Sequence, residues 1–391
     1  MRKISEMFVR AIAATLFSLL ALSPAKGQQI GKYVPIDAGS EADRIMKEIN
    51  AATDPAQKLP LIDKFAAGPG QGDLALVADD LYVNYYLSQK NYDKAFEYGD
   101  KLFAIDPENL NNAVNMIRAA NETHDTNKLL SYGEKAGALL QRYKASPPPA
   151  GTTPDNWQMQ KKQTLDANAD NIQYIEVSVY NGIYSTPAAA NRAERLIRFA
   201  HAFPDSRYAE AAMGLAATSY QQAQDVPKML STADELLSKD PNDLPMLLLL
   251  SDYYSEKGEQ LDKAAAYAQK AASLADTAPK PEGVTDEQWK RETMLQKGIA
   301  LSALGQVYLF KKENAKAVES LQAAAPLLKS DDASYGRNQY RLGFAYLNLR
   351  KISDARTALT QAASVKNPYQ ALAQEKLKTL PPAPAGHRKS S

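Results

Sequence analysis

The chain of 391 residues contains no cysteine and only three histidines, His124, His201 and His387. The absence of cysteine excludes disulfide bonds, zinc–thiolate sites and cysteine nucleophiles. The sequence also lacks the H-E-x-x-H and G-x-S-x-G motifs, a P-loop and the glycine fingerprint of dinucleotide-binding proteins. An enzyme needs convergent polar groups of matched pKa, so the sequence indicates neither catalysis nor a cofactor or metal site.

Neither sign of charge is in excess. The chain has 46 Lys and Arg against 45 Asp and Glu, which gives a formal net charge of +1. A nucleic-acid-binding protein needs a basic patch or stripe. The charge balance therefore argues against a nucleic-acid partner.

Long hydrophobic runs are also rare, and the clearest one lies near the N-terminus. Residues 11–22 are apolar, follow the basic Arg2, Lys3 and Arg10, and precede the small-x-small sequence at residues 25–27. A membrane-spanning helix needs about 20 apolar residues, so this run is too short. We expect a Sec-type signal peptide over residues 1–27, no stable membrane insertion after its removal, and a periplasmic or secreted protein. An uncleaved N-terminal anchor is the alternative.

What the sequence does contain is a repeated spacing of small and apolar residues. Four pairs recur at a constant offset (343 − 305 = 38): Gly305 and Gly343, Tyr308 and Tyr346, Ala317 and Ala355, and Leu321 and Leu359. The glycine and the alanine lie on consecutive helical patterns, where small side chains let two helices approach to about 8–10 Å between axes. Each copy therefore predicts a helical hairpin.

This spacing resembles the W-x2-L-G-x2-Y…A-x3-F signature of the tetratricopeptide repeat (TPR). The two consensus repeats are expected at residues 298–331 and 336–368. The resemblance implies an all-α, right-handed superhelical α-solenoid of TPR-like helical hairpins. It also implies a concave groove, lined by the first helices of successive repeats, that binds segments of other proteins or peptides.

A second motif predicts an internal duplication. The pattern Pro-x-Gly-x-Thr-x3-Trp runs from Pro149 to Trp157 and again from Pro281 to Trp289. After the first Trp, residues 157–184 are expected to form one long helix. The predicted organisation is a signal peptide (1–27), a flexible lead-in (28–39), an N-terminal capping hairpin (40–72), a first TPR-like module (73–206), a second TPR-like module (207–378) and a disordered tail (379–391).

Residues 203–212, FPDSRYAEAA, carry a further resemblance. This segment of about one repeat is similar to repeats of the outer-membrane assembly protein BamD and of the periplasmic cell-division coordinator that also carries TPRs. The resemblance implies an exported bacterial TPR protein.

Register with the family predicts which residues face the groove. The expected partner-binding positions are Asn84, Thr218, Gln221, Gln306, Phe310, Arg337, Tyr340, Phe344 and Asn348. Leucines and tyrosines already fill the core positions of the two consensus repeats, so the three aromatic residues of this set have the composition of a binding hot spot. We expect Tyr340 to be exposed, whereas Phe310 and Phe344 either line the groove or pack between repeats.

The family's carboxylate clamp, which grips a peptide C-terminus, is not expected. Asn84 matches one clamp position, but Asp80 stands where that mode requires Lys. The sequence thus predicts an exported scaffold that binds protein segments in the cell envelope of a Gram-negative bacterium. The alternative is a glycan- or peptidoglycan-binding accessory protein whose groove aromatics stack on sugar rings.

Overall fold

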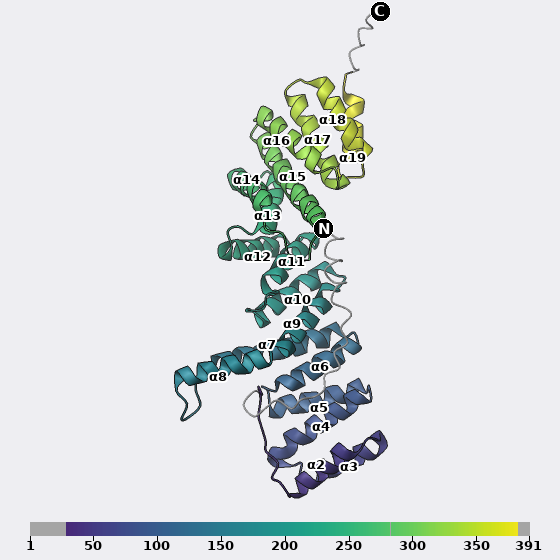
Figure 1. Cartoon of the computed structure of the whole chain (residues 1–391). Coiled ribbons are helices and arrows are strands. Elements are labelled where there is room, and N and C mark those ends of the chain that lie inside the picture. Colours follow the sequence, from purple (N-terminus) through teal and green to yellow (C-terminus); the bar gives the residue numbers. More distant parts are fainter. Residues whose placement is uncertain (1–28, 282, 382–391) are drawn as a thin grey trace, which may run out of the picture. The chain divides into compact units, whose positions relative to one another are not determined.

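The computed structural model describes residues 29–281 and 283–381, and within these ranges every regular element is a helix (Figure 1). Within each compact part of the chain, successive helices pack against one another in hairpins, as α4 does with α5 and α17 with α18. The predicted fold class, an all-α solenoid of TPR-like hairpins, is confirmed. The predicted signal peptide and residues 382–391 of the predicted tail lie outside the described residues. Within the part of the chain that is described, no helix combines the length and apolarity needed to cross a membrane.

The chain divides into two compact units, residues 1–225 and residues 226–391. The helices of the first unit are α2 (Glu41–Ala51), α3 (Pro55–Ala67), the 3-10 turn η1 (Gly72–Leu74), α4 (Ala75–Ser88), α5 (Tyr92–Ile105), α6 (Leu110–Glu122), α7 (Thr126–Ala145), α8 (Pro154–Ala167), α9 (Ala169–Tyr184), α10 (Ala189–Ala202) and α11 (Ala209–Gln222). The sequence places the module boundary at residues 206–207, whereas α11 packs against α10 and belongs to the first unit.

The helices of the second unit complete the chain. They are α12 (Val226–Lys239), α13 (Leu244–Lys257), α14 (Leu261–Thr277), α15 (Asp286–Phe310), α16 (Asn314–Leu327), α17 (Asp332–Asn348), α18 (Ile352–Ser364) and α19 (Gln370–Thr379). The consensus repeats correspond to the hairpin of the C-terminal half of α15 with α16 and to the hairpin of α17 with α18.

The glycines of the two consensus repeats lie at close helix contacts, as the repeat spacing predicts. A Cβ atom added to Gly305 would lie 2.5 Å from Cγ of Leu321, and one added to Gly343 would lie 2.6 Å from Cγ of Leu359. Both leucines are fully buried. Each hairpin is therefore closed by a glycine on its first helix and a leucine on its second.

The N-terminal hairpin begins with the expected caps. The Ser40 side chain accepts a hydrogen bond from the Asp43 amide at the start of α2, and the Asp54 side chain accepts one from the Ala56 amide at the start of α3. Pro55 follows at the first helical position, where a missing N–H costs nothing. These caps fix both helix starts of the predicted capping hairpin.

The segment that precedes this hairpin, predicted as a flexible lead-in, is held against the turn between α5 and α6. Ile30 is buried, and its carbonyl accepts a hydrogen bond from the Leu110 amide at 3.2 Å. The Lys32 amide donates to Asp106 Oδ2 at 2.8 Å, and its ammonium donates to the Ile105 carbonyl at 2.7 Å. These bonds could not be read from the polar composition of residues 28–39, because their partners lie more than 70 positions later.

The expected long helix over residues 157–184 is wrong. Two helices, α8 and α9, meet at Asn168, whose φ of −105° and ψ of 10° lie outside the helical region. The Asn168 side-chain amide donates to the Thr164 carbonyl at 2.8 Å and so competes with the helical hydrogen-bonding pattern. Figure 1 shows α8 lying along the C-terminal end of α7.

The two copies of the Pro/Gly/Thr/Trp motif have the same local structure. Trp157 Nε1 donates to the Ser146 carbonyl at 2.9 Å, and Trp289 Nε1 donates to the Ala278 carbonyl at 3.2 Å, in each case 11 residues back. Each acceptor is the C-cap residue of the preceding helix, and a threonine, Thr153 or Thr285, caps the helix that follows. These matching contacts support the internal duplication.

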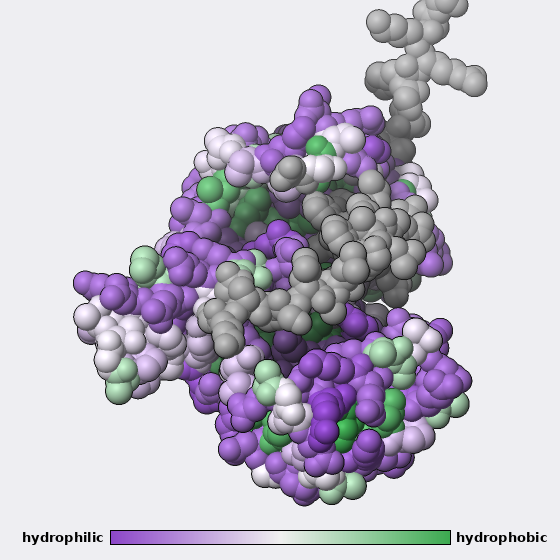
Figure 2. Space-filling model, turned by 60° about the horizontal axis from the view of Figure 1, so that its bottom comes forward, coloured by the Kyte–Doolittle hydropathy of each residue, from purple (hydrophilic) through white to green (hydrophobic). Residues whose placement is uncertain are grey.

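The surface is mainly polar. Figure 2 shows a predominantly hydrophilic face on which hydrophobic residues form small separate groups. Among the described residues, the large hydrophobic side chains that are exposed are Tyr33, Met159, Tyr174, Met294, Phe310, Leu349 and Leu372. Phe310 also lines a pocket, which makes it the first candidate of this set for a binding role.

Candidate functional site

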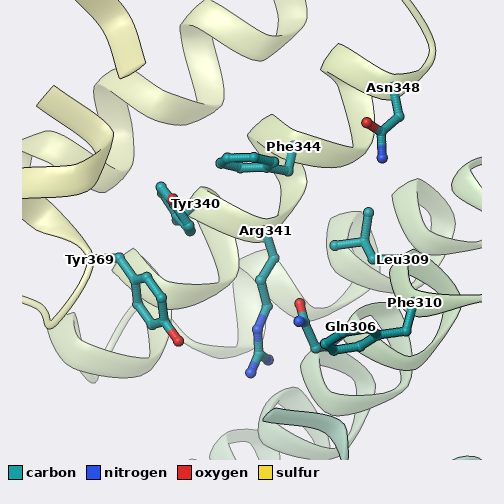
Figure 3. Close-up of a pocket in the computed structure, with 8 residues that line it drawn as sticks. All are labelled: Gln306, Leu309, Phe310, Tyr340, Arg341, Phe344, Asn348 and Tyr369. Carbon is teal, nitrogen blue, oxygen red and sulfur yellow. The ribbon is translucent and has the colours of Figure 1, made fainter. Parts of the chain in front are cut away.

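A pocket opens between the C-terminal halves of α15 and α17, in the second unit. Its volume is about 290 Å³. Its lining residues are Gln306, Leu309, Phe310, Tyr340, Arg341, Phe344, Asn348 and Tyr369. Figure 3 shows Phe344, Tyr340 and Tyr369 on one side, Leu309, Phe310 and Gln306 on the other, and the Arg341 side chain extending between them. We call this site the aromatic pocket.

Three aromatic rings form a continuous wall of this pocket. The ring centroids of Tyr340 and Phe344 are 4.9 Å apart, and those of Tyr340 and Tyr369 are also 4.9 Å apart with nearly parallel planes. On the opposite side, Phe310 is 45% exposed and lies over Gly258, where an added Cβ would be 2.8 Å from Cε1 of the ring. The result is a mostly apolar hollow.

Arg341 forms the floor of the pocket and is almost fully buried. Its Nη1 donates to the Ser302 carbonyl at 3.0 Å and to the Ser302 hydroxyl at 2.9 Å. Its Nη2 forms an ion pair with Glu256 on α13. The small side chain of Ser302 lets an arginine of α17 cross α15 and reach α13.

Two carboxylates, Asp252 and Glu256, lie one helical turn apart on α13. Together they bind the side chains of Arg337, Arg341 and Tyr369. Arg337 Nη2 lies 2.9 Å from Asp252 Oδ1, and Arg337 Nη1 lies 3.3 Å from Glu256 Oε1. The Tyr369 hydroxyl donates to Glu256 Oε2 at 2.9 Å. We call Asp252, Glu256, Arg337 and Arg341 the charge cluster; its two carboxylates and two guanidinium groups sum to zero formal charge.

Burial and neighbouring charges shift several pKa values here. Burial lowers the pKa of Arg341, and the nearby charge of Arg337 adds to this effect. For Arg337 burial also acts downward, but the Asp252 and Glu256 carboxylates act upward and the pKa is raised. Burial, followed by the charge of Glu256, raises the pKa of the Tyr369 hydroxyl. Burial thus prevails in the shift of Arg341, whereas the neighbouring carboxylates prevail in that of Arg337.

The structure brings together five of the residues predicted for the groove. Gln306 and Phe310 of α15 and Tyr340, Phe344 and Asn348 of α17 all line the aromatic pocket. The expectation that Tyr340 is exposed is wrong: its ring packs between Phe344 and Tyr369 and against the cluster of Leu359, Ala362 and Ala373. Its covering partner, Tyr369, lies beyond the last consensus repeat, where the repeat pattern gives no warning of it.

Arg337, which was expected at a partner-binding position of the groove, does not line the aromatic pocket. Its side chain is 18% exposed and engaged by two carboxylates of α13. Those partners lie 85 and 81 residues earlier in the chain. The repeat register predicts which face of its helix Arg337 lies on, but it does not predict which other helix packs against that face.

The remaining predicted residues belong to the first unit. Asn84 donates its side-chain amide to the Asp80 carbonyl at 2.8 Å and to Asp80 Oδ2 at 3.0 Å, and it borders a separate polar hollow with Arg118 and Glu122. Thr218 bonds the Leu215 carbonyl of its own helix, and Gln221 is exposed. These three residues do not line the aromatic pocket.

The sequence reasoning missed Leu309, Arg341 and Tyr369 in the pocket and both carboxylates behind it. One signal was present: Asp252 and Glu256, like Arg337 and Arg341, are spaced four apart on a helix, so each pair shares a face. Within the described residues, no cluster of three or more His, Cys, Asp or Glu has the arrangement of a metal site. The site can thus bury an apolar group of a ligand, next to arginine and carboxylate side chains that already pair with one another.

Comparisons with known proteins give similarity to solved structures alone. No protein-family model matches the sequence, and no curated protein matches it. A thermophilic TPR protein of Thermus thermophilus is 16% identical, with a TM-score of 0.33, over 52% of this chain and 96% of that chain. Yeast Tom70 is 12% identical, with a TM-score of 0.38, over 89% of this chain and 65% of that chain.

A chain of the APC/C hetero-tetramer Cut9–Hcn1 is also similar, at 12% identity and a TM-score of 0.42, over 86% of this chain and 62% of that chain. This chain therefore spans less than two thirds of the length of that protein and of Tom70. Identities this low relate the chains in fold alone, and none of their partners is carried over.

Proposed function

We propose that this protein is an exported interaction scaffold that binds an extended segment of another protein in the aromatic pocket. The observation that carries the proposal is the exposed Phe310 across the pocket from a wall of three adjacent aromatic rings. Large aromatic groups that are partly open and surrounded by polar amides have the composition of an interface hot spot. Gln306 and Asn348 supply those amides at the rim.

The proposal includes a place of action in the bacterial cell envelope. It is supported by the basic start, the short apolar run and the small-x-small sequence of residues 1–27. A protein segment suits the pocket better than a glycan does. A sugar ring stacks on an open aromatic face, whereas one face of Tyr340 is already covered by Tyr369.

Site-specific photo-crosslinking tests the proposed function. Benzoylphenylalanine in place of Phe310 or Phe344 should crosslink, in intact cells, to defined segments of one or a few envelope proteins, identified by mass spectrometry. The matched control is the same group in place of Leu372, which is 47% exposed on α19 outside the pocket. Equal products from positions 310, 344 and 372, or adducts to glycan in place of protein, would overturn the proposal.

A further inference from the structure

We propose that the aromatic pocket takes one aromatic, uncharged side chain of its partner segment, and that Glu256 sets this preference. This inference rests on the proposed function and adds to it the chemistry of the anchor and the residue that selects it. Four features of the site carry it: the pocket's size, the chemistry of its walls, the charge of its floor and the position of Tyr369.

The first feature is size. A cavity of about 290 Å³ lies just below the range of about 300–1,000 Å³ typical of pockets that enclose a drug-sized ligand. It is therefore suited to a single large side chain with part of its backbone. The Gln306 side chain has no hydrogen-bond partner within residues 29–281 and 283–381, so its amide is available to the backbone of the bound segment.

The second feature is the match between the walls and an aromatic group. Phe310, Phe344 and Tyr340 present ring faces and edges, and aromatic pairs gain about 0.5–1.5 kcal/mol beyond the area they bury. Arg341 lines the floor, and a planar guanidinium can stack on an aromatic face. Both effects favour an aromatic anchor over an aliphatic one of similar volume.

The third feature is the charge of the floor. Arg341 is paired with Glu256, and Arg337 is paired with Asp252 and Glu256, so the charge cluster offers no net attraction to an acidic or a basic side chain. A charged anchor would lose its hydration in the pocket without gaining an unpaired partner in the charge cluster. The intact cluster thus selects against charged side chains of either sign.

The fourth feature is the hydrogen bond between Glu256 and Tyr369, one of the aromatic residues of the pocket wall. Its Oε2 accepts the Tyr369 hydroxyl, while its Oε1 faces both arginines. Replacing Glu256 with glutamine removes one negative charge from beneath the pocket and weakens the support of Tyr369. Glu256 is a positioning residue, because it acts through Tyr369 and Arg341 and does not line the pocket itself.

Small amide probes test the inference in the full-length protein. Binding of N-acetyl-4-fluorophenylalanine amide is followed by 19F NMR, with the N-acetyl amides of leucine and of aspartate as competitors. In the wild type, the leucine probe should compete at least fivefold more weakly than the aromatic amide, and the aspartate probe should not compete. Phe344→Ala should weaken aromatic binding at least tenfold, whereas the exposed control Leu372→Ala should leave it unchanged.

The Glu256→Gln variant separates a selective role from a structural one. It should bind the aromatic amide severalfold more weakly and should gain competition by the aspartate amide, which a general loss of structure would not produce. Tyr369→Phe removes the same hydroxyl bond without changing charge; it should weaken aromatic binding and leave aspartate excluded. This variant remains informative if Glu256→Gln does not fold.

Competition by aspartate in the wild type, or unchanged aromatic binding in Phe344→Ala, would overturn the inference. If the aspartate amide still does not compete in a folded Glu256→Gln variant, Glu256 does not set the preference for uncharged side chains. If protein segments crosslink at positions 310 and 344 but the aromatic amide does not bind, the proposed function stands and the anchor chemistry is wrong. If nothing crosslinks while the amide binds, the pocket chemistry is right and the scaffold function is wrong.

Discussion

At the scale of single residues, the helix contacts depend on two glycines. Gly305→Leu and Gly343→Leu should each lower the free energy of unfolding by about 1–3 kcal/mol, because the added atoms overpack the contacts with Leu321 and Leu359. Chemical denaturation measures the change. The control Lys312→Leu, at an exposed turn residue, should stay within about 0.5 kcal/mol. Equal, small effects at all three positions would show that the helix pairing is wrong.

Asp80 gives the first unit a dependence on pH. Burial raises the pKa of its carboxyl to about 6, and the hydrogen bond from Asn84 opposes this rise. Because the folded state holds this proton more tightly than the unfolded state, the Asp80 contribution to stability falls as pH rises from about 4 to about 6.

The variant Asp80→Asn should therefore raise the free energy of unfolding at pH 8 by about 3 kcal/mol, since the pKa rises from 3.8 to about 6 and one pKa unit corresponds to about 1.36 kcal/mol. It should have little effect at pH 4, where the wild-type carboxyl is also neutral. Denaturation of both proteins at the two pH values measures the difference. A difference between the two proteins that is the same at both pH values would contradict the assignment.

The residue scale also shows what repeat register can predict. Gly305, Gly343 and the buried leucines opposite them were predictable, because each pair lies within one hairpin and recurs at the same offset. The same reasoning left Phe310 and Phe344 either in the groove or between repeats, and both line the pocket. It misplaced Arg337 and Tyr340, because their nearest partners come from α13 and from the residue before α19.

At the scale of elements, the charge cluster ties α13 to α17 across α15. Arg337→Ala would leave the mostly buried Asp252 carboxylate without an ion-pair partner, and Glu256 would keep only its pair with Arg341. We expect a loss of about 2 kcal/mol in the free energy of unfolding, below the 3–5 kcal/mol typical of fully buried pairs. The control Arg350→Ala, at an exposed turn, should change stability by less than about 0.5 kcal/mol. A loss at Arg337 no larger than that at Arg350 would mean that the cluster does not hold these helices.

Element boundaries show a second limit of the sequence. Positive φ recurs at the turn residues Lys90, His124, Gln224, Lys312 and Arg350, so five turns pass through the same left-handed conformation. None of the five is glycine, the residue type that marks such turns in a sequence. The break at Asn168 was missed for a related reason, since the helical periodicity continues on both sides of this one residue of non-helical conformation.

At the scale of the whole molecule, export is the prediction with the widest consequences. Intact-mass analysis of fractionated cells should find a chain that starts near Gln28 and is located outside the cytoplasm. The basis is the N-terminal pattern of residues 1–27. Recovery of the full-length chain, Met1 included, from the cytoplasm alone would contradict both the export and the envelope role.

The matched tryptophan contacts have a practical consequence. Trp157 and Trp289 are the only tryptophans of the chain, one stands in each compact unit, and each bonds the carbonyl at the end of the preceding helix. The protein thus carries one natural fluorophore for each unit, with the same indole hydrogen bond in both. Emission from the Trp157→Phe and Trp289→Phe variants reports on one unit at a time, so the two units can be observed separately without any added dye.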